Sequence, residues 1–185
     1  MQQEMTDPFL RSFFSRSSFP LKKLYLNAST FTPEYLVAVL DLVPTLVHLD
    51  LSFSNTSWNK EANSALMVYL LSHLATTTAL SSDTDSAASD KFLPQLEVLQ
   101  VYYWVGPEFP WTFVPDVVGS PSETGKAGHR PIKSITINTQ NLPPPQMLPG
   151  NIVDRLVNLQ QAGVNLGYRT FSNGPKFVPA TWEVI

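Results

Sequence analysis

The 185-residue sequence contains no cysteine, only three histidines, and 15% charged residues. The absence of cysteine excludes disulfides, thiolate metal sites and thiol nucleophiles. The formal net charge is −3, so we do not expect the basic face that nucleic-acid-binding proteins normally carry. At 43% hydrophobic residues, a chain of this length can still bury a core, hiding roughly 70% of its unfolded surface. We therefore expect one globular domain over residues 1–185 and no nucleic-acid partner.

Long hydrophobic runs are also missing. Charged residues, among them Glu4, Asp7 and Arg11, interrupt the N-terminal segment, so it lacks the apolar core of a signal peptide. The longest charge-free stretch that favours a helix, residues 62–82, contains asparagine, histidine and several hydroxyl side chains. We do not read it as a membrane span. These observations predict a cytoplasmic or nuclear protein with no membrane contact.

A recurring aliphatic pattern is the main positive feature. Leu21, Leu24 and Leu26 follow the spacing L-x-x-L-x-L, which neither a strand nor a helix explains by itself. The pattern returns at residues 46–51, 96–101 and 132–137, with middle aliphatics at positions 49, 99 and 135. The first step, from position 24 to position 49, falls inside the 20–29-residue range of leucine-rich repeats.

The pattern has a physical explanation in such a repeat. The last two aliphatics of each unit point inward from a short parallel strand, and the first packs at the corner that leads into it. Each unit leaves an open hydrophobic face, which the next unit covers. We therefore expect adjacent parallel strands in chain order, with the middle aliphatics stacked in one core layer. Those four residues are Leu24, Leu49, Leu99 and Ile135.

Helices are expected between the strands. In the first, Thr32 can act as N-cap, Pro33 occupies the first helical position and Pro44 ends the helix. Amphipathic patterns predict a second helix over residues 61–75 and a third over 151–163, the latter capped by Asn151 and ended by Gly163. The chain then becomes extended again at residues 164–170. The predicted fold class is α/β: a short, irregular leucine-rich-repeat array of parallel strands with helices on the convex side. A generic doubly wound sheet is the alternative.

Two stretches depart from this alternation. Residues 76–90 are small, polar and acidic, which indicates a mobile acidic and serine-rich insertion. Residues 105–131 contain five prolines and four glycines. We interpret them as a long Pro/Gly loop that replaces the expected helix and carries at most one short helical turn.

One protein family has similar sequence patterns. Residues 13–55, FFSRSSFPLKKLYLNASTFTPEYLVAVLDLVPTLVHLDLSFSN, resemble the C-terminal leucine-rich-repeat region of fungal F-box proteins, as do residues 93–101 and 154–170. The F-box that normally precedes these repeats has no counterpart in the sequence, so we take the chain as a fragment of a longer protein. The resemblance implies substrate recognition for an F-box-type ubiquitin ligase, without the part that docks on the ligase adaptor.

The sequence contains no recognisable catalytic or metal-binding motif. His48 should face outward from a strand, His73 lies on a helix and His129 lies in a loop, with no spacing typical of metal ligands. No G-x-S-x-G nucleophile motif occurs. We therefore predict no catalytic residue, no cofactor and no metal, and we do not expect an enzyme. Two alternatives stay open: an α/β enzyme with an unrecognised active site, and a degenerate structural repeat remnant.

The concave strand face is the candidate functional surface. Residues that flank the inward aliphatics project from it, and neighbouring strands lie about 4.8 Å apart, so these side chains form one polar and aromatic patch. Such a patch suits binding to a protein, whose identity the sequence does not give. Trp104 and Trp111 flank the same edge, where we expect them to serve in core packing or loop anchoring and not in ligand binding. The predicted protein-binding residues are Lys23, Tyr25, His48, Asp50, Gln100, Tyr102 and Thr136.

Overall fold

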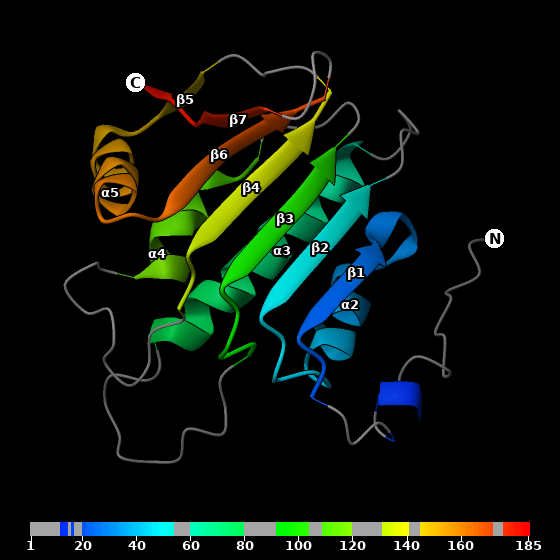
Figure 1. Cartoon of the computed structure of the whole chain (residues 1–185). Coiled ribbons are helices and arrows are strands. Elements are labelled where there is room, and N and C mark those ends of the chain that lie inside the picture. Colours follow the sequence, from blue (N-terminus) through cyan, green and yellow to red (C-terminus); the bar gives the residue numbers. More distant parts are fainter. Residues whose placement is uncertain are drawn as a thin grey trace.

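The computed structural model describes residues 12–14, 16, 20–53, 60–79, 92–103, 109–119, 131–140, 145–171 and 176–185. Within these residues the fold is mixed α/β, with a mostly parallel sheet and one layer of helices (Figure 1). The sheet has six strands in the order β1-β2-β3-β4-β6-β7. Their bounds are β1 Lys23–Asn27, β2 His48–Phe53, β3 Val98–Tyr103, β4 Ser134–Thr139, β6 Asn165–Thr170 and β7 Lys176–Pro179.

The strand order confirms the predicted arrangement of the aliphatic triplets. The first five strands of the sheet are parallel neighbours in chain order, and β7 pairs antiparallel with β6. Leu24, Leu49, Leu99 and Ile135 are in register, and Leu166 continues the row on β6. Each of the three middle members is fully buried, whereas Leu24 is partly buried because β1 is the edge strand. In a doubly wound sheet the strand order reverses direction part of the way across the sheet, and no such reversal occurs among the described strands.

The turns that lead into the strands repeat the same hydrogen bonds. The carbonyl of Lys22 accepts from the backbone N–H groups of both Val47 and His48, at 3.0 and 2.9 Å. The carbonyl of Val47 accepts in the same way from residues 97 and 98, and that of Glu97 from residues 133 and 134. The aliphatics at these corners, Leu46, Leu96 and Ile132, are buried. The corner position in L-x-x-L-x-L therefore has one recurring geometry.

The helices are η1 Ala28–Thr30, α2 Pro33–Leu40, α3 Lys60–Ala79, η4 Trp111–Phe113, α4 Val114–Val118 and α5 Gly150–Gln161. In Figure 1, α2, α3 and α4 form a layer behind the sheet, and α5 lies beside β6. A separate pair of parallel strands, β5 (Gln146–Leu148) and β8 (Trp182–Val184), lies beyond β6. None of the helices, within the residues described, is long and apolar enough to cross a membrane.

The helix termini test the capping predictions. The Thr32 hydroxyl accepts from the Tyr35 N–H at 3.2 Å and Pro33 begins α2, as expected. The helix ends at Leu40, before Pro44. The prediction for Asn151 is wrong: α5 begins one residue earlier, at Gly150, and no side chain caps it. Gly163, with φ of 93°, occupies the left-handed position after α5, which glycine adopts without steric cost.

Two predicted irregular stretches are partly helical. Residues 76–79 belong to the end of α3 and not to an insertion, and residues 80–90 lie outside the described part. Within the predicted Pro/Gly loop, residues 111–118 form η4 and α4, and Trp111, Val114 and Val117 are buried in the helical layer. Proline is tolerated in a first helical turn, so Pro115 does not prevent α4. Residues 104–108 and 120–130 lie outside the description.

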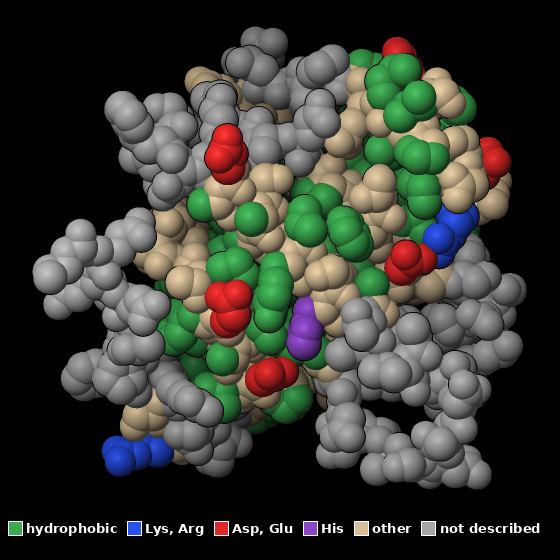
Figure 2. All heavy atoms as spheres, turned by 180° about the vertical axis from the view of Figure 1, so that it is seen from behind, with side chains coloured by type: hydrophobic (Ala, Val, Ile, Leu, Met, Phe, Trp, Pro, Cys, Tyr) green, Lys and Arg blue, Asp and Glu red, His purple; other side chains and the backbone are tan. Residues whose placement is uncertain are grey.

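The two sides of the sheet therefore differ. In the reverse view of Figure 2, hydrophobic side chains gather over the helical side, with isolated acidic side chains among them. On the opposite side, no described helix lies in front of the sheet in Figure 1. We call this second side the open face.

Candidate protein-binding face

Three rows of side chains, each crossing five strands, make up the open face. The strand register places the outward residues of β1, β2, β3, β4 and β6 side by side, because successive side chains of a strand alternate between the two faces. The first row is Lys23, His48, Val98, Ser134 and Asn165; the second is Tyr25, Asp50, Gln100, Thr136 and Gly167; the third is Asn27, Ser52, Tyr102, Asn138 and Arg169. All seven residues predicted to bind a protein lie in these rows.

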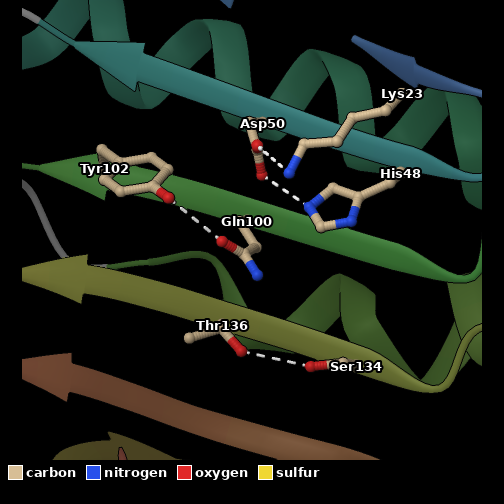
Figure 3. Close-up of polar contacts among 7 residues, drawn as sticks. All are labelled: Lys23, His48, Asp50, Gln100, Tyr102, Ser134 and Thr136. Atoms are coloured by element: carbon tan, nitrogen blue, oxygen red, sulfur yellow. Dashed lines mark hydrogen bonds and ion pairs between the residues drawn. The ribbon is translucent and has the colours of Figure 1, made fainter. Parts of the chain in front are cut away.

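Asp50 organises one end of the face (Figure 3). Its Oδ1 lies 2.8 Å from Nε2 of His48, and its Oδ2 lies 3.3 Å from Nζ of Lys23. The Asp50 side chain is 6% exposed, whereas that of Lys23 is 62% exposed. Because both carboxylate oxygens have cationic or hydrogen-bonding partners, the buried charge is compensated. The cluster fixes the orientation of the His48 ring and the Lys23 chain.

Tyr102 is the second fixed element. Its hydroxyl donates a 3.1 Å hydrogen bond to Oε1 of Gln100, and its ring meets that of Tyr25 edge-on at 6.4 Å (Figure 3 shows the hydrogen bond). Partial burial, and next the negative charge of Asp50, raise the pKa of Tyr102 above its ordinary value. The hydroxyl is therefore protonated and available as a donor at neutral pH. Tyr25 is 60% exposed and stands above the sheet.

Two of the predicted binding residues are not accessible. Asp50 is 4% exposed and Thr136 is 3% exposed, although both belong to the outward rows. In register, Asp50 lies between Tyr25 and Gln100. Thr136 lies between Gln100 and Gly167, and the Phe177 ring packs over Gly167. Thr136 lies within hydrogen-bonding distance of Ser134, with 3.1 Å between their hydroxyl oxygens. Both residues therefore lie beneath the exposed side chains of the face. The expectation that they project freely from it is wrong.

The face extends onto strands that the repeat pattern did not include. Arg169 and Gly167 lie on β6, and the Phe177 ring of β7 packs over Gly167. The sequence prediction recognised the extension at residues 164–170 but did not continue the face onto it. The alternation of Leu166 and Tyr168, both buried, is the signal that assigns their neighbours to the outward side.

The tryptophan and histidine predictions have mixed outcomes. Trp111 is fully buried and donates through Nε1 to the Tyr168 hydroxyl at 3.0 Å, as expected for core packing. His73 stacks on Tyr69 and meets Phe92 edge-on, so it contacts aromatic side chains on the helical side. Trp104 and His129 lie outside the described residues.

The described side chains of the open face are suited to binding, and they do not form a catalytic nucleophile–base pair. The His48–Asp50 pair is an acid–base arrangement, but Ser134 in the same row lies two strands away, at about 10 Å. A nucleophile must lie within hydrogen-bonding reach of its base. In the part of the chain that the structure describes, no group of three histidine or acidic side chains could hold a metal ion.

Comparisons with known proteins add no further assignment. No family model, no curated protein and no solved structure matches the chain.

Proposed function

We propose that the chain is a protein-binding repeat domain whose binding surface is the open face. The observation that carries this proposal is the register of the five parallel strands, which aligns polar and aromatic side chains in three rows on the side where no described helix lies. Tyrosine with oriented hydrogen-bonding neighbours is typical of protein interfaces. Tyr25 supplies exposed aromatic area, and Lys23 supplies an exposed charge.

We further propose that the sheet is an irregular leucine-rich-repeat array. Three features support it: strands in chain order, aliphatic rows in register, and corner carbonyls that each accept from two N–H groups of the following turn. By its resemblance to the repeats of fungal F-box proteins, the domain would recognise the substrate of a ubiquitin ligase. The partner is then a protein whose ubiquitination depends on this chain.

A matched pair of tyrosine variants tests the binding face. Tyr25 on the open face and Tyr69 on the helical side are both exposed, at 60% and 38%. A photo-crosslinking amino acid at position 25 should capture a protein in native extract, and the same group at position 69 should not. With the captured protein purified, Tyr25→Ala should weaken binding by about 2 kcal/mol, the size of an interface hot spot, and Tyr69→Ala should not.

The experiment has a clear negative outcome. If the captured protein binds Tyr25→Ala as tightly as the parent chain, the open face is not the binding surface. Circular dichroism of both variants checks that the fold is intact, since exposed substitutions usually change stability by less than about 0.5 kcal/mol. The ubiquitin-ligase role is tested separately, by measuring whether ubiquitination of the captured protein falls when the chain is removed.

A further inference from the structure

Asn138 on β4 is a buried polar residue without partners. It is 2% exposed, and neither its Nδ2 nor its Oδ1 has a hydrogen-bond partner among the described residues. Ile135 and Ile137 point into the core, so alternation directs Asn138 to the open face. A carboxamide carries a donor and an acceptor, and leaving both unpaired in a buried position destabilises the fold. Packing alone therefore does not explain an asparagine at this position.

The neighbours of Asn138 give the site a positive charge. In register, Tyr102 lies on one side and Arg169 on the other. The Tyr102 hydroxyl is already used by Gln100. Arg169 has no ion pair within the described residues, whereas Lys23, the other cation in the three rows, is paired with Asp50. The third row holds no acidic side chain, so its formal charge is that of Arg169.

An aromatic side chain borders the same end of the face. The Phe177 ring lies over Gly167, in the row next to Asn138, and is 39% exposed. On the opposite border, Tyr102 meets the exposed ring of Tyr25. The unpaired carboxamide and the unpaired guanidinium thus lie between two aromatic borders, an arrangement that suits an extended segment lying across the strands.

We propose that Asn138 and Arg169 bind an extended acidic segment of the protein partner. This inference rests on the proposed function and specifies the chemistry of its ligand. A main-chain amide of the segment pairs with the Asn138 carboxamide, because a peptide presents the complementary N–H and C=O together. A carboxylate of the segment pairs with Arg169, whose planar guanidinium suits bidentate contact. A fully deprotonated inorganic anion such as sulfate has no donor, so it would satisfy Arg169 and Nδ2 but would leave Oδ1 unpaired.

The segment reaches Asn138 by moving the side chains beside it. Both atoms of the carboxamide are covered in the free chain, and the flanking Tyr102 and Arg169 side chains are half-buried. Rotamer changes of partly exposed side chains are fast compared with binding. Binding therefore requires that Arg169 turn toward the incoming carboxylate and that the carboxamide become accessible to the segment.

Two asparagine variants on the same face separate this site from its surroundings. Asn138→Leu keeps the approximate size of the side chain and removes its polar atoms. Asn165→Leu makes the same chemical change in the first row, where Asn165 is exposed. Arg169→Gln removes the charge while it keeps a polar side chain. Unfolding midpoints in urea confirm that each variant is folded; Asn138→Leu should be at least as stable as the parent because it loses an unpaired buried group.

The probe is a displayed library of random linear peptides, selected on the parent chain. We expect enrichment of acidic sequences. A selected peptide, measured by fluorescence anisotropy, should bind Asn138→Leu at least about tenfold more weakly and Asn165→Leu as it binds the parent. Arg169→Gln should lose the preference for that peptide over its counterpart with Asn and Gln in place of Asp and Glu.

Three results would overturn the inference. They are an unchanged affinity of Asn138→Leu, complete displacement of the peptide by inorganic sulfate, and selection of no peptide. If the captured partner still depends on Tyr25 in any of these cases, only the acidic-segment site fails and the proposed function stands. If the partner depends on neither Tyr25 nor Asn138, both fail.

Discussion

The ring of Phe177 lies directly over the backbone of Gly167, where a Cβ atom would come within 2.7 Å of Phe177 Cζ and 2.5 Å of the Val178 carbonyl oxygen. Glycine in a strand marks a place where another group approaches the backbone closely. Here the approach joins the antiparallel strand β7 to the last parallel strand, β6. The absence of a side chain at position 167 thus permits the close packing of β7 residues on β6.

Gly167→Ala should destabilise the protein by about 1–3 kcal/mol, the usual effect of overpacking. Since one of the two close contacts is to backbone, adding Phe177→Ala should not restore the loss. Urea unfolding measures it. Gly150→Ala is the matched control, because its Cβ would meet only the movable Val184 side chain, at 3.3 Å. Equal effects of the two substitutions would show that the contact at Gly167 is not special.

The Trp111–Tyr168 hydrogen bond should contribute to stability. Tyr168→Phe removes the acceptor of the buried indole N–H, which should cost about 1–3 kcal/mol. Trp111→Phe combined with Tyr168→Phe removes both partners, so the double-mutant cycle isolates their interaction. A coupling energy of zero would contradict the hydrogen bond.

Truncating an aliphatic residue of the inward row should destabilise the protein more at the centre of the sheet than at its edge. Leu49→Ala in the second strand should cost about 2–5 kcal/mol, because Leu49 is fully buried. Leu24→Ala in the edge strand should cost less, because Leu24 is only partly buried. Denaturant midpoints of the two variants test this order. The reverse order would contradict the position of β1 at the edge of the sheet.

Tyr103 should make stability fall at high pH. Burial raises the pKa of the Tyr103 hydroxyl far above its ordinary value of 10.0. As the pH rises past about 10, the unfolded chain therefore releases a proton that the folded chain retains, and stability falls by up to about 1.4 kcal/mol per pH unit. The contribution is fully present below this pH. Tyr103→Phe should remove this part of the alkaline loss.

At neutral pH the same substitution should be nearly neutral or stabilising. The Tyr103 hydroxyl is buried without a hydrogen-bond partner in the described part of the chain, so phenylalanine loses no bond there. Parallel unfolding curves of parent and variant from about pH 7 to about pH 11 measure both effects. Identical pH profiles would show that Tyr103 ionises normally in the folded state.

The sheet could be predicted from the sequence because its signal is local and repeated. Leu24, Leu49 and Leu99 occupy the same place in an L-x-x-L-x-L unit, and units that bury the same face against one another align in register. The start of α2 was predictable for a similar reason, since Thr32 and Pro33 act within one helical turn. Neither prediction depends on residues far away in the chain.

The helical segment at residues 111–118 depends on tertiary contacts. Its proline, Pro115, and its short length favour a loop, and burial of Trp111 in the helical layer overrides that preference. Asp50 and Thr136 also differ from the prediction for this reason. Strand alternation predicts their direction, but their burial depends on the side chains that the fold places around them from other strands.

The sequence by itself determined the strand units, their inward aliphatics and the outward direction of the residues between them. Only the tertiary structure decided that β6 and β7 extend the open face and that Asn138 is buried without a partner beside Arg169. The physical reason is the range of the interactions. Periodicity acts within one segment, whereas burial and hydrogen bonding depend on side chains that the fold brings together from distant segments.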